Sequence, residues 1–295
     1  MRRDPAAGDS GAALPGIVPD DGAPAGPRPD AAPAAEVGAA TVDTAALEAK
    51  VKAMYRAVAE EPSGAYHFEV GRRLAERLGY PAKLLDRLPA GAVDSFAGVG
   101  YHFHLADLEP GERVLDMGSG SGMDAFLAAL LVGPEGWVVG VDMTREQLDK
   151  AERLRAAAGL SWVSFVEGRI EALPFPDARF DAVLSNGVIN LAPDKAAVFA
   201  EAARVLRPGG RLAVADIVTE VPLTPKIVCN ADLWASCIGG AAHQDAYREG
   251  MEASGLRVET VARNRYEFLS DSARSASARY GVKSASVLAR KREES

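Results

Sequence analysis

A glycine-rich turn directly follows a run of apolar residues in the sequence VLDMGSGSG, residues 114–122. Glycine has no Cβ, so the backbone of such a turn can approach a ligand closely. The turn opens a helical stretch at 123–131, whose free amide groups and positive dipole end favour an anion. Asp142 ends the next apolar run, about twenty residues later, where a carboxylate can accept hydrogen bonds from both ribose hydroxyls. These residue types at this spacing predict a nucleoside-cofactor site.

The spacing of the glycines also bears on which cofactor is bound. A dinucleotide fingerprint has the form G-x-G-x-x-G, whereas this turn is G-x-G-x-G, and Met123 stands where the fingerprint has its third glycine. A dinucleotide-dependent dehydrogenase is therefore the less favoured interpretation. An ordinary tight turn between a strand and a helix is the structural alternative for any single glycine motif.

Alternating strand and helix patterns surround this turn, and such alternation is typical of an α/β fold with a parallel sheet. Because ligands of such sheets lie beyond the carboxyl ends of the strands, Gly118, Asp142, Gly168 and Asn186 should converge on one crevice. The pattern predicts strands at 113–117, 137–142, 162–166, 180–185 and 210–216, helices at 123–132, 144–158 and 195–206, then helical segments near 226–239 and 243–254 and strands at about 256–266 and 284–290.

The chain before the sheet divides into two parts. Residues 1–43 are rich in Ala, Pro, Gly and Asp without periodicity, which predicts a disordered tail. From Thr44, apolar residues recur at three- and four-residue spacing, which indicates an amphipathic helix. We interpret 44–109 as a helical lid with a substrate-loop segment and 110–295 as the core.

Composition narrows the classes of partner. The 295 residues are 48% hydrophobic and carry a net charge of −8, which argues against a nucleic-acid surface or an anionic membrane. No apolar run approaches the roughly 20 residues of a membrane span, and the N-terminus lacks a signal-peptide pattern. Two cysteines, Cys229 and Cys237, form no disulfide framework. We therefore expect a cytoplasmic protein without nucleic-acid or membrane partners.

Several motifs in order resemble the class I S-adenosylmethionine-dependent methyltransferases over roughly residues 110–220. These are VLDMGSGSG, GVDMT, EGRIEALPFPDARFD and RVLRPGG. The resemblance implies a Rossmann-like α/β fold, with a mostly parallel seven-stranded sheet, an antiparallel C-terminal strand and a helical N-terminal lid. It also implies S-adenosyl-L-methionine as the cofactor. No metal is required for methyl transfer from this cofactor, since it carries its own leaving group.

The resemblance implies a set of cofactor-binding residues. The glycine turn would hold the methionine end, Asp142 the ribose and Met143 one face of the adenine. Asn186 would face the methyl-transfer space, although a turn or capping role is its structural alternative. Tyr55 would lie against the sulfonium cation, or else serve as a core aromatic. The predicted set is Tyr55, Asp116, Gly118, Ser119, Gly120, Asp142, Met143, Arg169, Ile170, Glu171 and Asn186.

Within this superfamily the chain is most similar to arsenite methyltransferases, over roughly residues 46–290. SNGVINLAPDK at 185–195 and LWASCIGGA at 233–241 carry this likeness. Those enzymes hold arsenic-binding cysteines at three positions where this chain has Val99, Gly187 and Cys237. Because trivalent arsenic is held by several thiolates, a single sulfur does not reproduce that coordination. We therefore predict an organic acceptor, a specialised metabolite methylated at carbon, oxygen or nitrogen.

An aromatic loop just before the core is the predicted acceptor pocket. Tyr101, His102, Phe103 and His104 supply stacking surfaces and two bases that titrate near neutral pH. Solvated or capping histidines are the structural alternative, and a metal site is poorly supported because the loop lacks a cysteine or paired carboxylate. The predicted catalytic residues are Tyr101, His102, His104 and Cys237.

Two further functions stay open from the sequence. The first is methylation of a thiol or metalloid that uses Cys237, and the second is a non-catalytic module that binds S-adenosylmethionine. An intact site between Gly118 and Asp142 implies cofactor binding in every case and so does not separate them. A closed pocket with an oriented base favours catalysis, whereas a flat apolar face favours assembly.

Overall fold

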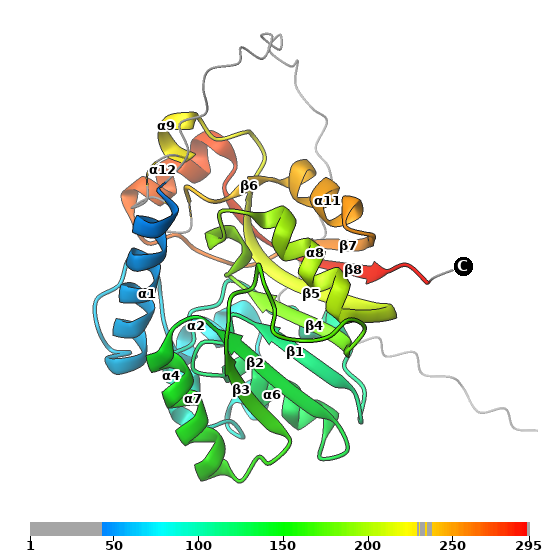
Figure 1. Cartoon of the computed structure of the whole chain (residues 1–295). Helices are drawn as coiled ribbons and strands as arrows, with labels where there is room; N and C mark the ends of the chain where they lie inside the picture. The colour runs from blue at the N-terminus through cyan, green and yellow to red at the C-terminus, as the bar shows by residue number, and fades with distance from the viewer. Residues whose placement is uncertain (1–42, 229, 231–233, 235–237, 294–295) are drawn as a thin grey trace, which may run out of the picture.

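A central sheet with helices on both faces organises the chain (Figure 1). The computed structural model describes residues 43–228, 230, 234 and 238–293. Its strands are β1 (Arg113–Met117), β2 (Trp137–Asp142), β3 (Val163–Glu167), β4 (Phe180–Asn186), β5 (Leu206–Thr219), β6 (Ala242–His243), β7 (Leu256–Arg263) and β8 (Lys283–Lys291). Their order across the sheet is β3-β2-β1-β4-β5-β8-β7, and the short β6 pairs with β5 off this path. Among these strands β8 runs antiparallel to both of its neighbours.

The predicted fold is confirmed: the sheet is mostly parallel with an antiparallel C-terminal strand. The two-residue β6 adds an eighth strand that the sequence pattern did not predict. The strand predicted at 210–216 extends in both directions, over Leu206–Thr219, because β8 pairs with it along most of that length. Of the helical segment predicted near 226–239, residues 229, 231–233 and 235–237 lie outside the described part of the chain.

The helices fall into two groups along the chain. Before the sheet come α1 (Thr44–Glu60), α2 (Arg72–Leu78), α3 (Ala82–Leu85), α4 (Ala90–Asp94) and α5 (Phe103–Ala106). Between and after the strands come α6 (Met123–Val132), α7 (Arg145–Ala158), the 3₁₀ turn η1 (Ile189–Leu191), α8 (Lys195–Val205), α9 (Pro225–Val228), α11 (Gln244–Ala253) and α12 (Asp271–Tyr280).

The strands bury both of their faces because successive side chains point to opposite sides of the sheet. Val114 and Ala182 pack with α6 and the N-terminal helices on one side. Leu115 and Val183 pack with α8 and α11 on the other side. This two-sided burial explains the continuous apolar runs of the sequence. The parallel direction of β1 to β5 brings the carboxyl ends of these strands to one edge.

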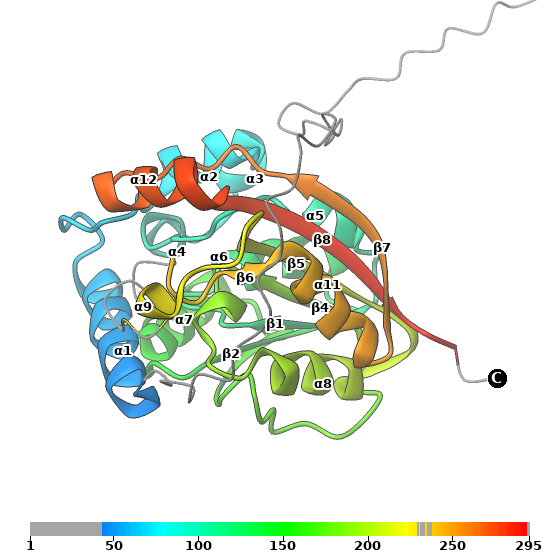
Figure 2. The same cartoon turned by 90° about the horizontal axis from the view of Figure 1, so that it is seen from above.

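Helix α1 lies across α7 at this edge of the molecule (Figures 1 and 2). Asp43 caps it by accepting a hydrogen bond from the amide of Ala46 at 3.0 Å. Polar contacts tie it to α7, since Gln147 Nε2 donates to the carbonyl of Tyr55 at 2.8 Å and Lys150 Nζ to that of Ala59 at 2.9 Å. The segment at 44–109 is helical as predicted, and its role as a lid stays a prediction.

Two other predictions concern the ends and the environment of the chain. The tail predicted at 1–43 lies outside the described residues except for Asp43. None of the helices in the described part combines the length and the apolar character needed to cross a bilayer.

Candidate active site

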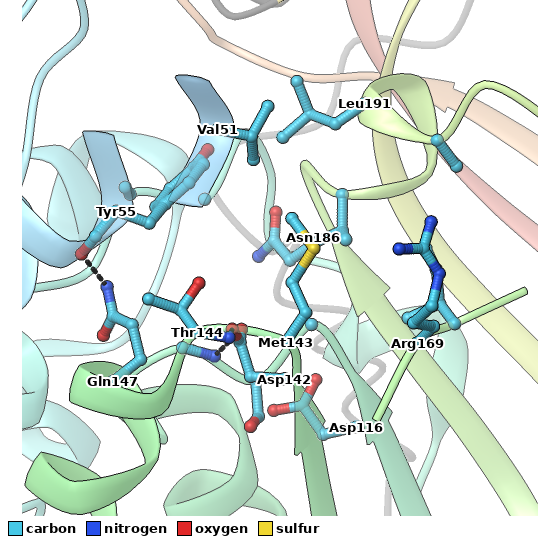
Figure 3. Close-up of a pocket in the computed structure, with 18 of the residues that line it drawn as sticks. Val51, Tyr55, Asp116, Asp142, Met143, Thr144, Gln147, Arg169, Asn186 and Leu191 are labelled. Atoms are coloured by element: carbon cyan, nitrogen blue, oxygen red, sulfur yellow. Dashed lines mark hydrogen bonds between the residues drawn. The ribbon is translucent and has the colours of Figure 1, made fainter. Parts of the chain in front are cut away.

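The carboxyl ends of β1, β2 and β4 open into a cavity beneath α1 (Figure 3). The cavity encloses about 1140 Å³ of space, its open mouth included. Gly118, Asp142, Gly168 and Asn186 all lie in its wall, as expected for residues that end parallel strands. All members of the predicted cofactor-binding set line this one cavity: Tyr55, Asp116, Gly118, Ser119, Gly120, Asp142, Met143, Arg169, Ile170, Glu171 and Asn186.

The glycine turn needs its glycines for two separate reasons. Gly118, Gly120 and Gly122 have φ values of +74°, +52° and +91°, in the left-handed region that other residues rarely adopt. A Cβ on Gly118 would also lie 2.6 Å from Cγ1 of Val188. The amides of residues 118 and 119 donate to the carbonyl of Val141 at 2.7 and 3.0 Å, which holds β1 and β2 together where the turn begins.

Asp142 connects the turn to the next helix. Its Oδ2 accepts from the amide of Gly120 at 2.9 Å and its Oδ1 from the amide of Thr144 at 2.8 Å (Figure 3). Burial raises the pKa of this carboxyl, and the bonds from Thr144 and Gly120 oppose that rise. A carboxylate oxygen can accept two hydrogen bonds. Each oxygen of Asp142 can therefore accept a further bond from a hydroxyl in the cavity, in addition to its bond from a backbone amide.

Asp116 and Asp124 place two more buried carboxyls in the same wall. Burial raises the pKa of Asp116 well above its ordinary value, and the charges of Asp124 and Asp142 raise it further. Its Oδ2 is buried without a hydrogen-bond partner among the described residues. Burial likewise raises the pKa of Asp124 to about 6. Carboxyls grouped in this way favour a cationic ligand, whose charge stabilises their ionised form.

The part of the chain that forms this cavity matches known methyltransferases in sequence and in fold. Residues 108–255 match the family model described as a methyltransferase domain. The crystal structure of an arsenic(III) S-adenosylmethionine methyltransferase from Chlamydomonas reinhardtii matches with a TM-score of 0.56 and 30% identity, covering 76% of this chain and 74% of that one. The chain belongs to the class I S-adenosylmethionine-dependent methyltransferases. Its cofactor is S-adenosylmethionine, and the cavity with its glycine turn and buried carboxyls fits that cation.

Two further methyltransferases are similar to this chain, one over about half of its own length and one over nearly all of it. The arsenite methyltransferase of Halobacterium salinarum is 41% identical over 199 residues, which make up 67% of this chain and 51% of that protein. The chain thus spans about half the length of that relative. Geranyl diphosphate C-methyltransferase from Streptomyces coelicolor A3(2) shares the fold, with a TM-score of 0.58 and 14% identity over 83% of this chain and 97% of that one.

The mouth of the methyltransferase cavity is charged. Arg169 pairs with Glu48 of α1, and its other terminal nitrogen lies 3.5 Å from Glu171. Tyr55, also on α1, stacks on Phe68 with the ring centroids 6.1 Å apart and lines the cavity. These contacts bring α1 over the residues that follow β2 and β3 (Figure 3).

The other end of the cavity is apolar. Leu47 and Val51 of α1 and Leu191 of η1 belong to a buried cluster that also contains Val99. A Cβ on Gly187 would lie 3.3 Å from Cγ1 of Val99, so these two positions adjoin in space. They are two of the three positions where the resemblance to arsenite methyltransferases implies cysteines. The third, Cys237, lies outside the described residues.

The aromatic loop does not line the cavity. His102 is fully buried, and burial together with the charge of His104 lowers its pKa to about 3. Burial also lowers the pKa of His104. The ring of Tyr101 packs edge-on against Tyr80 with centroids 4.7 Å apart. The catalytic role of Tyr101, His102 and His104 therefore stays a prediction that their placement does not support.

Sequence reasoning missed several polar residues of the cavity wall. These residues are Asp124, Thr144 and Gln147. Asp124 lies in the first turn of α6, after the glycine turn, and Thr144 and Gln147 lie at the start of α7, after β2. The position at the start of these helices was the sequence signal that could have identified them. Asp216 ends the strand that the sequence predicts at 210–216, a position that suggested a place in the pocket. In the structure it lies within β5, buried against Tyr247, whose hydroxyl donates to it at 2.9 Å. Within the described part of the chain, no group of three His, Cys, Asp or Glu could hold a metal.

Proposed function

We propose that the protein transfers the methyl group of S-adenosylmethionine to a small-molecule acceptor. This proposal depends on one observation: two regions line the same cavity. The first, at Gly118 and Asp142, has the residue types of a nucleoside-binding site, and the second, at Val51 and Leu191, is apolar. The cofactor supplies an activated methyl group on its sulfonium. The chain must bind it, orient the acceptor in line with that methyl group and keep water out.

The cofactor would lie along the three carboxyls of the cavity wall, Asp116, Asp124 and Asp142. The glycine turn and the positive end of α6 that follows it would receive the carboxylate of the methionine end. The unpartnered Oδ2 of Asp116 is suited to an ammonium group, and Asp142 to the ribose hydroxyls. The ring of Tyr55 would face the sulfonium through a cation–π contact.

An organic acceptor is the chemistry that the apolar end favours. Val99 and Gly187 carry no sulfur. Val99 belongs to the apolar cluster with Leu47 and Leu191, and Gly187 adjoins Val99. Three thiolates around trivalent arsenic would need cysteines there. We therefore propose methylation of an apolar organic molecule at carbon, oxygen or nitrogen.

Trivalent arsenic is the second candidate acceptor, and the comparisons favour it. The similar proteins from Halobacterium salinarum and Chlamydomonas reinhardtii are both named as arsenic methyltransferases. Cys237 retains one of the three cysteines that the resemblance implies. This candidate predicts that arsenic methylation proceeds with fewer thiolates than the soft metalloid ordinarily takes.

Calorimetric titration with S-adenosylmethionine, with and without trivalent arsenic, tests the proposal when it is paired with mass spectrometry of the products. Cofactor binding and methylation of organic candidates without methylarsenicals would support the organic acceptor. Methylarsenical formation would support the second candidate. Cofactor binding without any methylated product would instead favour the non-catalytic module, and absence of cofactor binding would overturn the proposal.

Replacing Cys237 with serine separates the two acceptors. If the acceptor is organic, Cys237→Ser should leave the rate of product formation within about twofold, since serine is nearly isosteric with cysteine. If a thiolate holds arsenic, the same change should abolish methylarsenical formation. Cys229→Ser is the matched control, because it removes the other thiol of the chain.

Cofactor affinity should depend on pH. Asp124, with its pKa at about 6, is partly protonated in the empty cavity near pH 6. Burial raises the pKa of the neighbouring Asp116 as well. A bound cation lowers both pKa values, so binding releases protons and affinity rises as the pH rises through about 6. Titration at pH 6 in two buffers of different ionisation enthalpy measures this release. An affinity that is equal at pH 5 and pH 7.5 would contradict the assignment.

A further inference from the structure

A chain of hydrogen bonds between buried polar groups crosses the wall of the cavity. The hydroxyl of Tyr80 donates to Oδ1 of Asp124 at 2.7 Å. Asn186 Nδ2 donates one hydrogen to Oδ2 of Asp124 at 2.9 Å, and the hydroxyl oxygen of Tyr80, 3.1 Å from the same nitrogen, shares that hydrogen. The single proton of Tyr80 points to Asp124, so its lone pairs are free to face the amide. The ionised carboxylate thereby sets the direction of every bond in this group.

The opposite side of Asn186 holds the backbone of a loop. Its Oδ1 accepts from the amides of Val99 and Gly100 at 2.8 and 3.3 Å, and its Nδ2 donates to the carbonyl of Gly100 at 2.9 Å. From β8, Ser284 Oγ donates to the carbonyl of Val99 at 2.7 Å. A Cβ on Gly98 would lie 2.6 Å from Asn186 Nδ2, so the loop lies directly against this amide.

The orientation of the Asn186 amide decides whether these contacts exist. If the amide turned over, Nδ2 would face two N–H donors and Oδ1 would face the carboxylate of Asp124. Each of those pairs is repulsive, and an unmade buried hydrogen bond is costly. Asp124 and Tyr80 therefore select the amide orientation that binds the loop.

The loop forms part of the proposed acceptor end. Ala97 and Gly98 line the cavity, and Val99 packs in the apolar cluster with Leu47 and Leu191. Asp124 lines the cavity at the glycine turn, whereas Tyr80 does not line it. The hydrogen-bonded group thus connects the cofactor wall to the acceptor wall.

We propose that Asp124 and Tyr80 are positioning residues, which act through Asn186 to hold the backbone of residues 98–100 in place at the acceptor end of the cavity. This inference rests on the proposed function, which assigns that end to the acceptor. The two residues touch neither the reacting atoms nor the acceptor in this role. They set the shape of the wall that the acceptor meets.

The protonation of Asp124 gives this arrangement a pH dependence. Tyr80, Tyr101 and Asp116 face Asp124, and Asp142 faces Asp116. Burial raises the pKa of Asp124 to about 6, and the bonds from Tyr80 and Asn186 oppose that rise. The carboxylate accepts both bonds above that pH, whereas the protonated group has one oxygen that donates. The loop should therefore lose protection as the pH falls through about 6.

Hydrogen exchange in the full chain tests the proposal. In Tyr80→Phe, the amides of Val99 and Gly100 should exchange about tenfold faster at pH 7.5, the effect expected for one lost buried hydrogen bond. Tyr247→Phe is the matched control, because it removes the hydroxyl of another buried tyrosine that donates to an aspartate, Asp216, at 2.9 Å. It should leave the exchange of the loop unchanged.

A pH series supplies the second measurement. In the wild-type chain, protection of Val99 and Gly100, corrected for intrinsic exchange, should fall with a midpoint near pH 6. The midpoint should move to higher pH in Tyr80→Phe, since the bond from Tyr80 lowers the pKa of Asp124. A role of Tyr80 in packing alone would not move it.

Two outcomes would overturn the inference: wild-type exchange rates in a folded Tyr80→Phe, or equal loop protection at pH 5 and pH 7.5 in the wild-type chain. If Tyr80→Phe does not fold, the wild-type pH series decides. Titration of the wild-type chain with S-adenosylmethionine is run alongside. Failure of the wild-type chain to bind S-adenosylmethionine would overturn the proposed function. This titration does not depend on the hydrogen-exchange rates of the loop, so the two failures can be distinguished.

Discussion

Replacing Asp142 with alanine should weaken S-adenosylmethionine binding by about 100-fold or more. In the proposed binding mode the carboxylate accepts from both ribose hydroxyls, and hydrogen bonds to charged groups contribute about 1.5–3 kcal/mol each. The change also removes the acceptor for the amides of Gly120 and Thr144, at 2.9 and 2.8 Å, so the glycine turn loses one of its supports. Isothermal titration calorimetry measures the change in affinity.

Asp149→Ala is the matched control for this variant. Asp149 is an exposed aspartate of α7 that pairs with Arg145 at 3.0 Å, on a neighbouring surface outside the cavity. Exposed ion pairs contribute about 0–1 kcal/mol, so this variant should bind the cofactor like the wild type. Wild-type affinity in Asp142→Ala would show that the ribose is held elsewhere.

The cofactor wall was predictable because its residues follow directly from local patterns. Gly118 and Asp142 each end an apolar run, and alternation of strands and helices places the ends of parallel strands at one edge. The pattern needed no knowledge of distant contacts. The bounds of β1, β2 and α6 agree with the sequence prediction for the same reason.

The polar network was not predictable because it joins segments that are far apart in sequence. Tyr80 and Asp124 are 44 residues apart, and Tyr80 and Asn186 are 106 apart. A helical pattern assigns Asp124 to a first turn, where an acidic residue commonly faces solvent and the helix dipole. That it is buried and paired follows from how Tyr80, between α2 and α3, packs with residues of α6, which no local spacing encodes.

The aromatic loop at residues 101–104 was predicted to form the acceptor pocket, but it does not line the cavity. Two histidines in three residues suggested bases by their type, yet side-chain type does not reveal burial. The side chain of His102 is fully buried, and burial lowers its pKa to about 3. A histidine of that kind carries no charge at neutral pH, so its residue type alone was a poor guide to chemistry.

Gly118→Ala should destabilise the fold by about 3 kcal/mol and abolish cofactor binding. The left-handed φ of +74° costs a residue with a side chain about 1–2 kcal/mol. The new methyl group would also lie 2.6 Å from Cγ1 of Val188, and overpacking costs about 1–3 kcal/mol. Urea denaturation measures the free energy of unfolding, and calorimetry measures the affinity.

Gly111→Ala separates the two causes. Gly111 has a φ of +87°, yet a Cβ there would meet nothing within 4 Å, so its substitution carries the backbone strain without the contact. The difference between the two variants is the cost of the contact with Val188. The double variant Gly118→Ala, Val188→Ala should recover part of that cost and retain the strain, because alanine at 188 removes the two methyl groups and leaves only its own Cβ, 2.9 Å from the new one. Equal destabilisation in Gly111→Ala and Gly118→Ala would show that the close contact between residue 118 and Val188 contributes nothing to the cost. That result would contradict the proposed cause of the destabilisation.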